Sequence, residues 1–156
     1  CTVIGFPLGY NTTAIKVAEV QDALQNGAKE VDMVVNLGWV KDGLFDLVTE
    51  EIKALKAAAG DNVLKVIVET CYLTEEEKIA LCKCVTDAGA DYIKTSTGFG
   101  TGGATMADIL LLKEHIGPQV KIKASGGIRT KEDIEGYLKA GVDRIGASSA
   151  IQAYEE

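Results

Sequence analysis

The chain has 156 residues, 47% of them hydrophobic and 25% charged, which is typical of one soluble globular domain with a sizeable core. A net charge of −7 argues against nucleic acid as a partner, because binding to a duplex requires a basic face. No apolar run approaches the ~18 residues of a membrane-spanning helix, so we expect no membrane partner.

Short β-branched runs alternate with longer segments of helical spacing from one end of the chain to the other. Strands separated by helices indicate βα units and a parallel sheet, either an open doubly wound sheet or a barrel. The six predicted strands are Thr2–Phe6, Val31–Asn36, Val63–Glu69, Tyr92–Thr95, Val120–Ala124 and Arg144–Ala147.

Helix boundaries are marked by two kinds of residue. Thr74 with Glu77 three residues later forms a capping-box pattern, and Thr105 and Thr130 are suited to cap the next two helices. Similar glycine-containing tetrapeptides, centred on Gly27, Gly89 and Gly141, precede three of the strands, and each glycine is suited to end a helix. Recurrence of one unit favours a barrel over an open sheet.

Lysines at the ends of two neighbouring strands are the main candidates for chemistry. Lys94 and Lys123 each end a strand, and Asp32 adds a carboxylate to a strand that is otherwise apolar around it. Barrel active sites lie at the carboxyl ends of the strands. Two ammonium groups in one cavity repel each other, so we expect one of them to lose its proton easily and to act as a nucleophilic amine. Each of these residues, taken alone, could equally have a structural role. On chemistry alone we interpret Lys65, on the strand before Lys94, as structural.

Glycine-rich loops follow the last three predicted strands. Glycine lets backbone N–H groups approach an anion closely, and barrels often hold a phosphate in the loops after their last strands. Tight turns also use glycine, so each loop alone is weak support. The loops are Gly98–Gly103, Gly126–Gly127 and Gly146–Ser149.

The cysteines and the single histidine, His115, do not form a metal-binding pattern. The spacing of Cys1, Cys71, Cys82 and Cys84 matches no zinc motif. We therefore predict no metal and no cofactor, and free thiols in a reducing, cytoplasmic location.

In combination, these motifs resemble the deoxyribose-phosphate aldolase family, and the resemblance extends from Cys1 to about Ser149. The matching stretches are Cys-Thr-Val-Ile-Gly-Phe-Pro, Glu-Val-Asp-Met-Val-Val-Asn, Lys-Val-Ile-Val-Glu-Thr, Ile-Lys-Thr-Ser-Thr-Gly-Phe, Lys-Ala-Ser-Gly-Gly-Ile-Arg-Thr and Arg-Ile-Gly-Ala-Ser-Ser.

The resemblance implies a cofactor-free class I aldolase that interconverts 2-deoxyribose 5-phosphate with acetaldehyde and glyceraldehyde 3-phosphate. Lys94 matches the family's Schiff-base lysine, Lys123 the lysine that perturbs it, Asp32 the carboxylate of its proton relay, and Lys65 a further lysine that lines the cavity. Positions around the family's phosphate site, with Arg129 beside them, are matched by Gly98, Gly126, Gly127, Gly146, Ser148 and Ser149.

The resemblance also implies that the first two βα units are missing, since Cys1 aligns with the start of the third barrel strand. We therefore expect residues 1–156 to form an incomplete TIM-type barrel of six parallel strands, as one domain. Two open edges predict a homodimer or a higher even oligomer. Two rival functions remain: a non-catalytic remnant that serves as a phosphate-binding or assembly module, and a lysine aldolase with a different aldehyde specificity.

Overall fold

The computed structural model describes residues 1–155 and contains one six-stranded parallel sheet in the order β1-β2-β3-β4-β5-β6. This confirms the predicted fold class, with each strand beside its neighbour in sequence. The strands are β1 (Thr2–Ile4), β2 (Glu30–Val34), β3 (Val63–Ile67), β4 (Tyr92–Lys94), β5 (Lys121–Ser125) and β6 (Arg144–Gly146).

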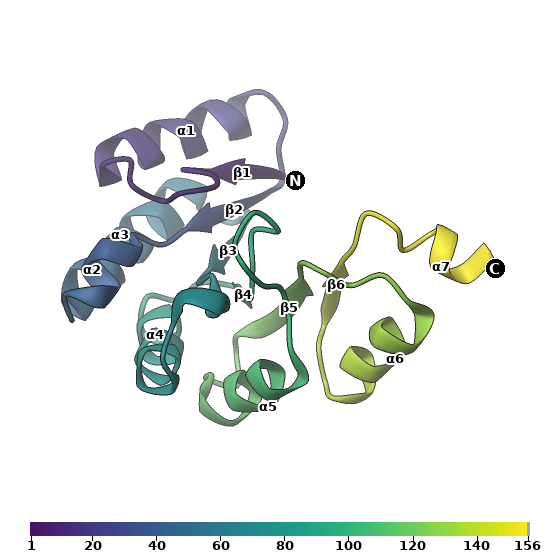
Figure 1. Cartoon of the computed structure of the whole chain (residues 1–156). Coiled ribbons are helices and arrows are strands. Elements are labelled where there is room, and N and C mark those ends of the chain that lie inside the picture. The colour runs from purple at the N-terminus through teal and green to yellow at the C-terminus, as the bar shows by residue number, and fades with distance from the viewer. Residues whose placement is uncertain (156) are drawn as a thin grey trace.

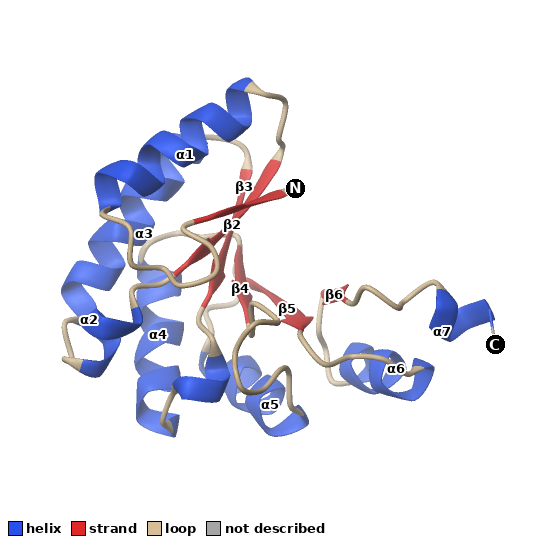
Figure 2. Ribbon diagram, turned by 45° about the horizontal axis from the view of Figure 1, so that its top comes forward, coloured by secondary structure: helices blue, strands red, loops and turns tan. Residues whose placement is uncertain are grey.

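Helices form an arc along one side of this curved sheet, and this arc leaves the other side uncovered (Figures 1 and 2). Along the arc α1 packs against α3, α3 against α4, and α4 against α5. The helices are α1 (Thr13–Gln25), α2 (Leu37–Lys41), α3 (Phe45–Ala59), α4 (Glu75–Asp87), α5 (Met106–His115), α6 (Lys131–Lys139) and α7 (Gln152–Glu155), with a short 3-10 turn, η1, at Thr70–Tyr72. None of these helices combines the length and apolar character that spanning a bilayer requires.

The predicted helix signals are confirmed. Thr74 and Glu77 form a complete capping box at the start of α4, and the side chains of Thr105 and Thr130 accept backbone hydrogen bonds at the starts of α5 and α6. The glycines at 27, 89 and 141 all have a positive φ, as a helix-ending glycine requires.

The two faces of the sheet differ in chemistry because side chains alternate along each strand. On the outer face, apolar residues such as Met33, Val66 and Ile93 are fully buried in the core beneath the helices. Paired positions on the inner face carry charged residues: Asp32 lies opposite Lys65, and Lys94 opposite Lys123. The parallel register therefore gathers these charges on the face opposite the helix arc.

Candidate active site

Three lysines converge on one carboxylate on the inner face of the sheet. The Nζ atoms of Lys94 and Lys123 each lie 2.9 Å from Oδ2 of Asp32. The Nζ of Lys65 lies 2.9 Å from the other oxygen, Oδ1. The residues come from β2, β3, β4 and β5, and the parallel register brings them together. The structure thus unites four of the five charged residues selected from the sequence; the fifth, Arg129, lies in the wall of the cavity described below.

The pKa of Asp32 depends on its burial and on its three lysine partners. Asp32 is 1% exposed, and burial alone would raise its pKa. Hydrogen bonds from Lys123, Lys65 and Lys94, together with the charge of Lys94, outweigh that effect and lower its pKa to about 2. Asp32 is therefore ionised at neutral pH and acts as the shared anion of the cluster.

The pKa of Lys94 falls below the ordinary value of a lysine. Burial is the largest cause, and the charge of Asp32 opposes it. The charge of Lys123 also lowers the pKa of Lys94, with a smaller effect. Like-charge repulsion, which the sequence suggested as the cause, is therefore secondary to desolvation.

Lys65 lies below the surface of the site and does not line the cavity described below. Its side chain is fully buried and is also paired with Glu30, 2.5 Å from Nζ. The same carboxylate of Glu30 accepts a hydrogen bond from Arg144 of β6. Lys65 therefore links Asp32 to a second group of charges, Glu30 and Arg144, which lies beneath Lys94 and Lys123. Glu30 was not predicted as a site residue from the sequence, although alternation along β2 places it on the same inner face as Asp32.

A cavity of about 880 Å³ opens above Lys94 and Lys123, at the carboxyl ends of β4, β5 and β6. All seven residues matched to a phosphate site line it, together with both lysines. Its wall also contains residues not selected from the sequence: Thr97, Phe99, Ser125, Ile128, Ala147, Gln152 and Ala153.

The loops around this cavity require glycine at particular positions. Gly126 and Gly127 have φ of 84° and 72°, in the left-handed region. A Cβ on Gly146 would lie 3.2 Å from Cε of Lys123, so this glycine leaves room for the lysine stem. No backbone hydrogen bond joins the N–H groups of Gly98, Gly127 or Ser148 to another part of residues 1–155. These donors remain available to an anion in the cavity.

The described residues contain no group of three or more histidine, cysteine, aspartate or glutamate side chains placed to hold a metal ion. All four cysteines are free, and Cys82 and Cys84 are buried. The charged cluster consists instead of amines around a carboxylate, a donor set suited to proton transfer and to nucleophilic attack by an amine.

Comparison with known proteins gives one consistent family. A family model for DeoC/LacD family aldolases matches residues 3–152. A deoxyribose-phosphate aldolase of Clostridium botulinum (strain Eklund 17B / Type B) is 64% identical over 151 residues, which cover 97% of this chain and 68% of that protein.

Solved structures agree with this match. An aldolase called QR15 superposes with a TM-score of 0.94 at 47% identity, covering 98% of this chain and 69% of that one. A deoxyribose phosphate aldolase from Aeropyrum pernix, described as a tetramer, has a TM-score of 0.84 at 36% identity and covers 98% and 65% of the two chains. The chain thus spans about two thirds of the length of these relatives.

Proposed function

Because the chain belongs to the DeoC/LacD aldolase family, we propose that it cleaves and forms 2-deoxyribose 5-phosphate through a Schiff base on Lys94. The observation that carries this proposal is the shared carboxylate. Lys94 and Lys123 both hydrogen-bond Oδ2 of Asp32, and both amines line the cavity while the carboxylate lies beneath them.

Lys94 is the nucleophile in this proposal. Its lowered pKa leaves a larger fraction of neutral amine at neutral pH than an exposed lysine has. The neutral amine adds to the aldehyde carbon C1 of the open-chain sugar and forms a carbinolamine. Loss of water from this carbinolamine then gives a protonated imine.

Lys123 and Asp32 are placed to move the protons of these steps. Oδ2 of Asp32 lies within hydrogen-bond distance of both amines, so a proton can pass between Lys94 and Lys123 without a large movement. Loss of a well-placed general acid or base costs roughly 10²–10⁴-fold in rate.

Carbon–carbon cleavage uses the imine as an electron sink. A base removes the proton from the C3 hydroxyl, the C2–C3 bond breaks, and its electron pair forms an enamine on the two-carbon fragment. The three-carbon fragment leaves as glyceraldehyde 3-phosphate. Protonation of the enamine and hydrolysis of the resulting imine release acetaldehyde and regenerate Lys94. No metal or cofactor takes part in this sequence.

The glycine loops hold the phosphate of the substrate in the proposal. The N–H groups of Gly98, Gly127 and Ser148 have no backbone partner elsewhere in residues 1–155, so they can donate to the phosphate. Arg129 adds a positive charge on the cavity wall. Binding at these loops would fix the distance from the phosphate to the aldehyde carbon at Lys94.

The identity to named deoxyribose-phosphate aldolases supports this function over a non-catalytic phosphate-binding or assembly module. Purified chain tested with 2-deoxyribose 5-phosphate should release acetaldehyde, detected by a coupled alcohol dehydrogenase. Lys94→Leu should abolish release, and Lys123→Leu should reduce it strongly. Lys53→Leu, at a half-exposed position on α3, is the matched control and should leave the rate unchanged. Equal rates for Lys94→Leu and the control would contradict the proposal.

A further inference from the structure

Glu69, just beyond the end of β3, has an unusual backbone. It is the one non-glycine residue in 1–155 with a positive φ, at φ 55° and ψ 65°. Its side chain is also buried, since the residue is only 3% exposed. A strained conformation of this kind persists where the surrounding structure holds it, and it is frequent beside functional sites.

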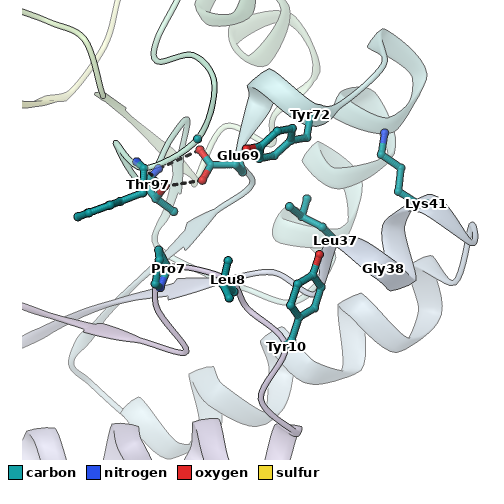
Figure 3. A pocket seen from close by; sticks show the side chains of 11 residues that line it. Pro7, Leu8, Tyr10, Leu37, Gly38, Lys41, Glu69, Tyr72 and Thr97 are labelled. Carbon is teal, nitrogen blue, oxygen red and sulfur yellow. Dashed lines mark hydrogen bonds between the residues drawn. The ribbon is translucent and has the colours of Figure 1, made fainter.

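The carboxylate of Glu69 is bound to the loop that follows β4. The backbone N–H of Thr97 donates to Oε1 at 3.0 Å, and the hydroxyl of Thr97 donates to Oε2 (Figure 3). That hydroxyl in turn accepts a hydrogen bond from the N–H of Phe99 at 3.0 Å. The chain is therefore held on both sides of Gly98, which has a φ of 88°.

Close packing reinforces these hydrogen bonds. A Cβ on Gly100 would lie 2.8 Å from Sγ of Cys71 and 3.2 Å from Cδ of Glu69, so the loop approaches as closely as glycine permits. The N–H of Thr70 also donates to the carbonyl of Thr95 at 2.9 Å. The connection after β3 and the loop after β4 thus form one unit.

Glu69 approaches the 97–99 loop from the side opposite the catalytic cavity. It lines a separate pocket of about 470 Å³, whose walls include Tyr10, Leu37 and Tyr72 (Figure 3). Thr97 and Phe99 line both this pocket and the catalytic cavity, whereas Glu69 does not line the latter. The 97–99 loop therefore separates the pocket from the catalytic cavity, and the carboxylate of Glu69 binds this loop from the pocket side.

We propose that Glu69 is a positioning residue that holds the 97–99 loop in the shape in which Gly98 binds the substrate phosphate. The inference rests on the proposed function, because it assumes that the glycine loops hold the phosphate. The carboxylate of Glu69 accepts two hydrogen bonds from Thr97, and hydrogen bonds to a carboxylate restrict a loop more strongly than neutral ones. Without them, Gly98 is free to leave the conformation in which it lines the cavity.

Binding of inorganic phosphate, measured by calorimetry, tests the role of the carboxylate without requiring catalysis. Glu69→Gln and Thr97→Val should each weaken binding by about tenfold, as expected for the loss of a charge-assisted hydrogen bond. Thr97→Ser keeps the hydroxyl and should bind within about twofold of the unsubstituted chain. Glu75→Gln, at an exposed position on α4, is the matched control and should leave binding unchanged.

Glu69→Gly separates the strained backbone from the carboxylate. Glycine adopts a φ of 55° without strain, so this variant should melt no lower than Glu69→Gln but should still bind phosphate about tenfold more weakly. Trapping of acetaldehyde on Lys94 does not use the phosphate site, and Glu69 does not line the catalytic cavity, so both Glu69 variants should keep the trapping rate within about twofold.

Two outcomes overturn the inference: phosphate binding within about twofold of the unsubstituted chain in both Glu69→Gln and Glu69→Gly, or no phosphate binding by the unsubstituted chain. The proposed function fails separately. A chain that binds phosphate in a Glu69-dependent manner but releases no acetaldehyde from 2-deoxyribose 5-phosphate would contradict the aldolase reaction and leave the role of Glu69 intact.

Discussion

Asp32→Asn removes the one anion shared by Lys65, Lys94 and Lys123 while keeping the shape of the side chain. The pKa of Asp32 is lowered from 3.8 to about 2. At about 1.4 kcal/mol for each pH unit, this corresponds to roughly 2 kcal/mol of stability at neutral pH. Removing one partner of a buried ion pair typically costs roughly 3–5 kcal/mol. We therefore expect the variant to lose roughly 2–5 kcal/mol of unfolding free energy at pH 7.

The same substitution should also change the pKa of the nucleophile, Lys94. Asp32 raises the pKa of Lys94, so its loss should lower that pKa further and shift the pH dependence of imine formation to lower pH. Turnover should nevertheless fall by roughly 10²–10⁴-fold, because the proton relay is lost.

Urea unfolding at a series of pH values measures the stability effect. A carboxyl group with a depressed pKa stabilises the fold above its unfolded pKa, and that stability is lost as the pH falls through the folded pKa. The difference between the unsubstituted chain and Asp32→Asn should therefore shrink between about pH 4 and pH 2. Asp61→Asn, at an exposed position, serves as the control. A difference that stays constant over this pH range, or an active and fully stable Asp32→Asn variant, would refute the role of Asp32 as a buried, ionised partner.

Two further predictions concern the same site, and a third concerns assembly. A chelator such as EDTA should leave aldolase activity unchanged; loss of activity that a divalent ion restores would indicate a metal-dependent mechanism. Gly127→Asp should raise the KM for 2-deoxyribose 5-phosphate by about tenfold or more through like-charge repulsion, whereas the isosteric Gly127→Asn should have a much smaller effect, and equal KM values would place the phosphate elsewhere. The homodimer or higher even oligomer expected from the sequence stays a prediction, and light scattering that finds a well-folded monomer at micromolar concentration would contradict it.

The sequence was most informative about features that depend on residues close together in the chain. The positions of Lys94 and Lys123 at the ends of two neighbouring strands were enough to predict that both amines lie in one cavity, since barrel active sites lie at the carboxyl ends of the strands. Helix starts at Thr74 and Thr105 were predicted because a capping side chain acts on residues of the same turn.

Features that depend on residues distant in the sequence were missed or only partly predicted. The strand predicted to extend to Glu69 ends at Ile67, and Glu69 turns into the left-handed region to reach Thr97, 28 positions later. The cause of the lowered pKa of Lys94 was also assigned incompletely. Burial dominates it, and burial depends on how β2 to β5 close over the amine rather than on the spacing of the lysines.

Borohydride reduction in the presence of acetaldehyde, followed by peptide mass mapping, tests the central claim most directly. An imine on the nucleophilic lysine is reduced to a stable ethylated amine, which stays on the peptide. We predict one modified peptide, with the added mass on Lys94, and no modification in Lys94→Leu. An adduct located mainly on Lys123 or Lys65, or no adduct at all in an active preparation, would contradict the assignment of Lys94 as the Schiff-base residue.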